Sequence, residues 1–170
     1  MSHYYAHVLQ MTKMIKQLDR WIEKGVAHAT AKKFDPAVLL DARLAPDMYP
    51  LVKQVQSACD GAKFLAARLA GVSPPKHADN EKTVDEVHAR IRSVLEFLGT
   101  LNETNFADTD ARVIPLGFMP GKGLNAIDFL TEFNLPNTYF HLCMAYAILR
   151  HSGVDLGKSE FIGSLNLRDM

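Results

Sequence analysis

Apolar residues recur at steps of three and four along the first 26 residues of the chain. This spacing places them on one face of a helix of about six turns. The opposite face mixes lysine and arginine with Asp19 and Glu23, as is typical of a solvated surface. The pattern therefore predicts a long amphipathic first helix. Its apolar stripe consists of Tyr5, Val8, Met11, Ile15, Leu18, Ile22 and Val26.

Two helix starts follow this segment. Asp35-Pro36 predicts a short helix over 37–43, because Asp can cap free amides and Pro fits the first helical turn. Asp47 is expected to cap a longer helix that ends at Gly71. The longer helix keeps strict helical spacing of its apolar positions. These positions are Leu51, Val52, Val55, Ala58, Cys59, Ala62, Leu65, Ala66 and Leu69.

The second half of the chain predicts two more long helices. Residues 83–86 (Thr-Val-Asp-Glu) form a capping box that begins one of them, and Gly99 closes it. Residues 101–125 lack a helical period and contain Pro and Gly turns, which predicts a long loop or a small hairpin over one end of the fold. Asn134 is expected to cap the last helix, and Gly153 ends it. Because this helix is apolar nearly all round, we expect it to be the most buried.

Four long helices with connecting segments predict an all-α fold, an antiparallel four-helix bundle. The length of 170 residues predicts a single domain over 1–170. Hydrophobic residues make up 48% and charged residues 22%, which favours an ordinary globular protein over a disordered or fibrous one. No apolar run approaches the ~18–20 residues that cross a bilayer, so no membrane partner is expected.

Charge and cysteine content narrow the expected partners and location. Nineteen Lys plus Arg balance nineteen Asp plus Glu, so the field expected of a nucleic-acid-binding protein is missing. The first residues lead directly into the amphipathic pattern without a secretory signal, which predicts a cytoplasmic protein. Cys59 and Cys143 lie in predicted helices without C-x-x-C spacing, and both are expected to be reduced core residues.

Asn137 and His141 are the most suggestive polar pair. They lie four residues apart, so their side chains project from the same face of the last helix. We expect this face to point inward, where an imidazole and a carboxamide could anchor a ligand or orient a water molecule. Alternatively, His141 donates one hydrogen bond to a neighbouring helix and Asn137 helps to cap its own helix.

The run from Asn137 to Gly153 resembles the last helix of DinB-like proteins, which carries a His-x-x-x-His pair, an apolar run and a glycine. In this comparison Asn137 occupies the first His position and His141 the second. The family's remaining metal-binding His lies seven residues after the cap of its second helix, and with Asp47 as that cap Gln54 occupies the position. The chain is most similar to a bacterial branch of unknown function, so the resemblance implies a fold but no reaction.

The resemblance also implies that a three-histidine metal site has become Gln54, Asn137 and His141. A carboxamide is a poor ligand for zinc or nickel in comparison with imidazole. We therefore expect no tightly held metal, with a weakly bound zinc or nickel ion as the alternative. The remaining polar triad is able to hydrogen-bond a small polar molecule.

Three functions are consistent with these residues. The first is binding of a small polar ligand by Gln54, Asn137 and His141. The second is a metal- or thiol-dependent transferase or hydrolase of the DinB-like type, in which His141 is the catalytic residue that orients or deprotonates a thiol. The third is a structural or oligomerising module whose buried polar residues set the helix register. A symmetric homodimer is the expected assembly.

Other polar residues show no site pattern. His77 falls in a predicted loop and His88 beside the apolar stripe of the third long helix, and neither has ligand spacing with another histidine. Asp60 projects away from the apolar stripe of its helix, so we expect it to be solvated.

Overall fold

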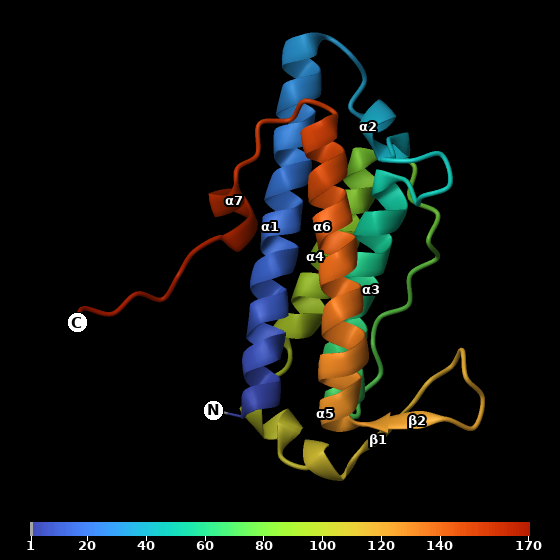
Figure 1. The fold of residues 1–170 in the computed structure, drawn as a ribbon, viewed down its shortest axis with the longest axis vertical. Helices are drawn as coiled ribbons and strands as arrows, with labels where there is room; N and C mark the ends of the chain where they lie inside the picture. Colours follow the sequence, from blue (N-terminus) through green and yellow to red (C-terminus); the bar gives the residue numbers. More distant parts are fainter. Residues whose placement is uncertain (1) are drawn as a thin grey trace.

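The structure is a computed structural model, and it describes residues 2–170. The long helices lie side by side, with α1 and α6 running opposite to α3 and α4 (Figure 1). The expected all-α, antiparallel four-helix bundle is confirmed. Its long helices are α1 (His3–Lys32), α3 (Leu51–Ala70), α4 (Val84–Gly99) and α6 (Leu135–His151).

The segment between α3 and α4 explains why these two helices run in the same direction. Residues 71–83 run back along the length of the bundle before α4 begins (Figure 1). Thr83 then caps α4 as predicted: its hydroxyl accepts from the Glu86 amide at 3.2 Å, and the Glu86 carboxylate accepts from the Thr83 amide at 2.9 Å. The capping box therefore fixes where the returning segment becomes helical.

Of the two helix starts predicted for residues 35–50, one is confirmed and the other is not. The short helix α2 (Ala37–Asp41) begins as predicted, because the Asp35 carboxylate accepts from the Ala37 amide at 2.9 Å. The predicted cap at Asp47 is wrong. α3 begins at Leu51 after an extended Pro50 that offers no side-chain cap. Since Pro50 has an extended ψ of 167°, the chain cannot be helical between residues 47 and 51.

The last long helix begins earlier than predicted. α5 (Ala126–Asp128), the π-helical segment η3 (Phe129–Asn134) and α6 follow one another without a break. Asn134 is therefore not a cap. Pro136 has no N–H to donate to the preceding turn and its ring crowds that turn, and the wider π turn before it provides room.

The 101–125 segment forms the small hairpin expected there. β1 (Val113–Pro115) pairs with β2 (Gly123–Asn125) in antiparallel register, with Ile114 opposite Leu124. The 3-10 turns η1 (Glu103–Phe106) and η2 (Thr109–Ala111) precede the hairpin and close the same end of the bundle. Within the described part of the chain, no helix is both long and apolar enough to cross a membrane.

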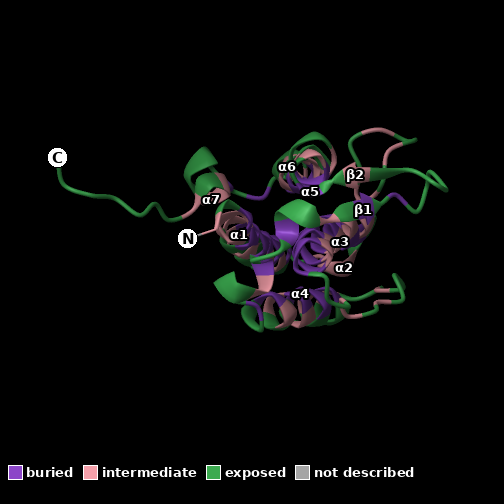
Figure 2. Ribbon diagram, turned by 90° about the horizontal axis from the view of Figure 1, so that it is seen from below, coloured by how far each residue is buried: buried purple, intermediate pink, exposed green. Residues whose placement is uncertain are grey.

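Burial is greatest in α3 rather than in α6 (Figure 2). Fourteen of the 20 residues of α3 are buried, against five of 17 in α6. The prediction that the last helix is the most buried is therefore wrong. α6 lies on the outside of the bundle, and its Phe140 and Cys143 are exposed. Both cysteines were expected in the core, but of the two only Cys59 is buried.

A short C-terminal helix, α7 (Lys158–Ile162), packs on the outer side of α1. The indole N–H of Trp21 donates to the Glu160 carbonyl at 3.1 Å, and the Trp21 ring stacks on Phe161 with centroids 5.3 Å apart. Residues after Gly163 extend away from the bundle (Figure 1). α7 is thus fastened to α1 through Trp21, through the Gln17 side-chain amide, which also donates to the Glu160 carbonyl at 2.8 Å, and through the Lys24–Glu160 ion pair.

Candidate functional site

Gln54 and His141 meet between α3 and α6. The His141 Nδ1 and the Gln54 Oε1 lie 2.8 Å apart, and Gln54 is 1% exposed. The Gln54 amide nitrogen donates to the Tyr49 carbonyl at 3.2 Å, so its oxygen must face the imidazole. An amide oxygen can only accept, so the proton of the neutral ring is on Nδ1. The lone pair on Nε2 of His141 is then available.

The environment of His141 favours the neutral ring. Burial lowers the pKa of His141, and the nearby positive charge of Lys53 lowers it further. Among residues 2–170, no group forms a hydrogen bond with Nε2. At neutral pH the site therefore presents an oriented hydrogen-bond acceptor that is also a base.

Asn137 does not join this pair as predicted. Its side chain is exposed and makes no hydrogen bond to another described residue. The buried line of α6 passes through Thr138, Leu142 and Ala145, which places Asn137 on the outer flank of the helix. The expected inward triad is therefore reduced to Gln54 and His141.

Buried contacts on the same side of α6 explain this register. The Asn134 side chain donates to the Gly61 carbonyl at 3.0 Å, and the Thr138 hydroxyl donates to the Asn134 oxygen at 3.4 Å. A Cβ at position 61 would lie only 3.0 Å from the Thr138 Cβ. Gly61 therefore lets the two helices approach closely, with Thr138 rather than Asn137 between them.

The residues at this position do not fit a resident metal ion. Gln54 Oε1 already accepts from the imidazole, which leaves Nε2 of His141 as the strong donor. Elsewhere in residues 2–170, no three His, Cys, Asp or Glu side chains gather closely enough to hold a metal. The donor set thus differs in kind from the three-imidazole site of the resemblance.

A family model described as a domain of unknown function, DUF1993, matches residues 3–162. The chain belongs to the DUF1993 family. A crystal structure described as a DinB family member protein from Shewanella denitrificans is 42% identical to this DUF1993 chain, with a TM-score of 0.91. The match covers 96% of this chain and 93% of that chain. No curated protein matches.

The comparisons confirm the DinB-like resemblance of this DUF1993 chain and its place in a branch of unknown function. The small-molecule ligand, the homodimer and the cytoplasmic location stay predictions.

A network of charged side chains between α3 and α4 was not predicted. Arg90, whose side chain is 1% exposed, contacts Asp60 at 2.6 Å, Asp79 at 2.6 Å and Glu81 at 2.9 Å. Asp60, which was expected to be solvated, is only partly so: its side chain is 29% exposed and also pairs with the buried Lys63 at 2.7 Å. The Asp60–Lys63 spacing of i,i+3 was the one sequence signal of this network.

His77 completes the network from the returning 71–83 segment. The Lys63 ammonium donates to His77 Nδ1 at 2.9 Å, so His77 Nε2–H donates to the Ser93 hydroxyl at 3.1 Å. Burial and the charges of Lys63 and Arg90 lower the pKa of His77, which keeps it neutral. Because His77 offers its proton to Ser93 rather than removing one, the arrangement is structural and not a nucleophile–base pair.

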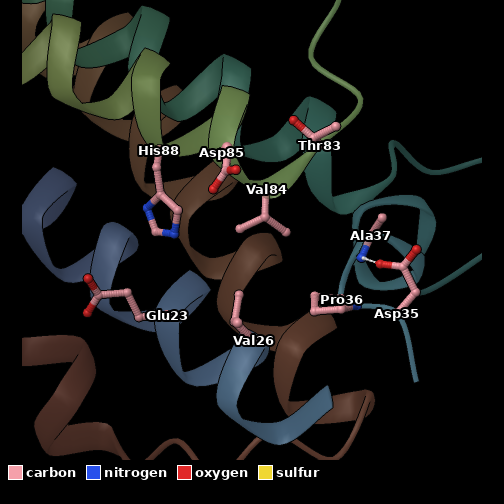
Figure 3. A pocket seen from close by; sticks show the side chains of 9 residues that line it. All are labelled: Glu23, Val26, Asp35, Pro36, Ala37, Thr83, Val84, Asp85 and His88. Atoms are coloured by element: carbon pink, nitrogen blue, oxygen red, sulfur yellow. Dashed lines mark hydrogen bonds between the residues drawn. The ribbon is translucent and has the colours of Figure 1, made fainter. Parts of the chain in front are cut away.

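A hollow of about 480 Å³ lies between α1, the start of α2 and the start of α4. Figure 3 shows its mixed lining of valines, carboxylates and His88. The Asp35 and Thr83 side chains are engaged in helix caps, and His88 Nδ1 contacts Asp19 at 2.6 Å. Structural contacts of these side chains therefore account for much of the polar lining.

Proposed function

We propose that this DUF1993 chain binds a small polar molecule without a metal, with Nε2 of His141 accepting a hydrogen bond from the ligand. The observation that carries the proposal is the 2.8 Å contact between His141 Nδ1 and Gln54 Oε1. It fixes the tautomer and holds the ring, as hydrogen-bonded partners hold functional histidines in other sites.

The chemistry of the site defines the ligand class. A neutral Nε2 accepts a proton or a hydrogen bond, so the ligand must carry a donor such as a hydroxyl, an amide N–H or a thiol. The exposed Asn137 lies one turn away on the same helix and supplies both a donor and an acceptor. The Phe140 ring meets the imidazole edge-on, with centroids 5.3 Å apart, and provides an apolar boundary.

The same free nitrogen favours a second candidate, a thiol-dependent transferase. Nε2 would take the proton of a thiol, forming an imidazolium and a thiolate. The thiolate would attack a second substrate and break its bond to a leaving group, which would receive the proton back from the imidazolium. The lowered pKa of His141 suits a base that must be unprotonated before the reaction. Binding of a thiol followed by its consumption would separate this candidate from simple ligand binding.

A panel of cysteine, glutathione, acetamide and small diols tests the proposal by calorimetry and by the shift in unfolding temperature. We expect a member of the panel to stabilise the wild type and His151→Ala, but not His141→Ala. His151 is the matched control, because it is exposed on the same helix. Equal stabilisation of His141→Ala by that compound would contradict the proposal.

Elemental analysis tests the metal-free part of the proposal. Protein purified without chelator or affinity tag should contain no stoichiometric zinc or nickel. A full equivalent of metal that disappears in His141→Ala would overturn it and favour the metal-dependent alternative.

A further inference from the structure

A second hollow, of about 350 Å³, lies at the end of α3 beside the hairpin. It is lined by Arg68, Arg112 and the three residues of β1. Arg68 is in the last turn of α3, and Arg112 directly precedes Val113. Fourteen residues separate Gln54 from Arg68, about 21 Å along the helix, so this hollow is separate from the His141 site.

Neither arginine has a carboxylate partner among the described residues. Within residues 2–170, no Asp or Glu oxygen lies within ion-pair distance of either guanidinium. Elsewhere in the same bundle, buried cations are paired: Arg90 has three carboxylates and Lys63 has Asp60. Since the chain has as many acidic as basic residues, the missing partner is a local property of this hollow.

The two guanidinium groups are nevertheless held in place. Arg68 lies over the rings of Phe64 and Phe129, 5.1 and 5.4 Å from their centroids, which leaves its N–H edges free. Burial lowers the pKa of Arg68, as expected for a cation that loses water without gaining an anion.

Arg112 is held against the C-terminal end of α3. It donates one hydrogen bond to the Ala70 carbonyl at 3.4 Å, whereas its Nε is buried and has no partner in the described part of the chain. A Cβ at Gly71 would overlap the guanidinium, so the glycine, at φ 71°, makes room for it. Two ordered cations therefore face one cavity with unused donors.

We propose that this hollow binds a small organic phosphate monoester, with Arg68 and Arg112 donating to the phosphate oxygens. Guanidinium groups suit phosphate because their N–H donors match its oxygens in pairs. A phosphate monoester carries about −1.5 to −2 charges near pH 7, which matches two arginines, whereas a carboxylate balances only one. Val113 is 66% exposed and, with Pro115, offers an apolar surface to the organic part.

Calorimetric titration with phenyl phosphate, inorganic phosphate and benzoate tests this assignment at low ionic strength. We expect phenyl phosphate to bind most tightly, and Arg68→Gln and Arg112→Gln each to weaken it by about tenfold or more. Arg92→Gln is the matched control, because it removes the same charge from an exposed position on α4. This control should bind like the wild type.

Several outcomes would overturn the proposal. Unchanged affinity in both Arg68→Gln and Arg112→Gln would show that the arginines do not hold the anion. An equal loss in Arg92→Gln would indicate non-specific attraction. Benzoate as tight as phenyl phosphate would overturn the phosphate assignment, and inorganic phosphate as tight would overturn the organic ester.

Folding of the variants is checked by their unfolding midpoints. If Arg112→Gln does not fold, Arg112→Lys keeps the charge without the planar fork and is expected to bind more weakly than the wild type. Wild-type affinity in both Arg112→Lys and Arg68→Gln would then overturn the proposal. None of these results depends on ligand binding at His141.

Discussion

The polar side chains on the two sides of α3 differ in how completely they are paired. Toward α4, Asp60, Lys63 and Arg90 carry full charges that are nearly all matched by partners. Toward α6, Gln54 contacts His141, which is neutral and keeps one ring nitrogen without a partner among residues 2–170. A network whose charges are paired holds a fold together, even though the buried Nε of Arg90 has no partner among residues 2–170, whereas an oriented group with a free atom can act on something else. The difference directs a search for function to the α6 side.

Removing Arg90 should produce the largest loss of stability. Arg90→Met leaves Asp60, Asp79 and Glu81 without their shared cation. Breaking a buried pair typically costs about 3–5 kcal/mol, and we expect the lower end because Asp60 and Asp79 are partly exposed and keep Lys63 and Lys53. Guanidinium chloride denaturation measures the change. Arg92→Met, at an exposed position of the same helix, should change stability by less than about 0.5 kcal/mol. A similar small change in both variants would mean that the network contributes little.

A methyl group at the α3–α6 contact should have the next largest effect. Gly61→Ala would place a Cβ 3.0 Å from the Thr138 Cβ and 3.1 Å from its Cγ2, so the helices must separate. We expect a net loss of about 1–3 kcal/mol, despite the better helix propensity of alanine. Gly99→Ala meets nothing within 4 Å, and it should be neutral or stabilising. A stable Gly61→Ala with unchanged Gln54–His141 contact would contradict close packing here.

Gln54→Leu tests the α6 side of α3 and should have a smaller effect on stability. The substitution removes the acceptor of the His141 Nδ1–H, and we expect a loss of about 1 kcal/mol. The ring nitrogen chemical shifts of His141 should change from the values of a single tautomer to the averaged values of both tautomers. His77, held by Lys63 and Ser93, should keep its own shifts and serves as the internal control. An unchanged His141 tautomer would show that Gln54 does not orient the ring.

The histidines and the carboxylates should contribute to the pH dependence of stability in two different pH ranges. The folded-state pKa values of His77 and His141 are lowered, so the unfolded chain takes up protons first and stability falls as the pH drops through about 6.5. The pKa values of Asp79 and Glu81 are also lowered, so their contribution is present above about pH 4 and is lost in stronger acid.

Urea titrations at several pH values measure both losses. His141→Gln should flatten the slope near pH 6.5 and leave the acid loss intact. An unaltered slope would mean that His141 is not held neutral by the fold.

Features that depend on residues close together in the chain were predictable from the sequence. The caps at Asp35 and Thr83 and the hairpin after residue 112 depend on neighbours within a few positions. The predictions of a cap at Asp47 and of the start of the last helix were wrong, because Pro50 and Pro136 restrict the backbone around them.

Features that depend on distant partners were not predictable in this way. Asp60 was misjudged because Arg90 lies 30 residues away, beyond a segment that returns along the bundle. The Gln54–His141 pair was expected from the positions that family histidines occupy. Asn137 was misplaced because the close approach at Gly61 sets the rotation of the last helix. The arginine hollow had no sequence signal, since an unpaired charge is recognisable only when its surroundings are known.

The position of Trp21 has a practical consequence. It is the single tryptophan of the chain, and its ring is covered by Phe161 of α7. Its fluorescence therefore reports the local docking of the C-terminal segment as well as global denaturation. A change in emission that precedes the loss of helical circular dichroism would reveal that this segment detaches while the bundle is still folded.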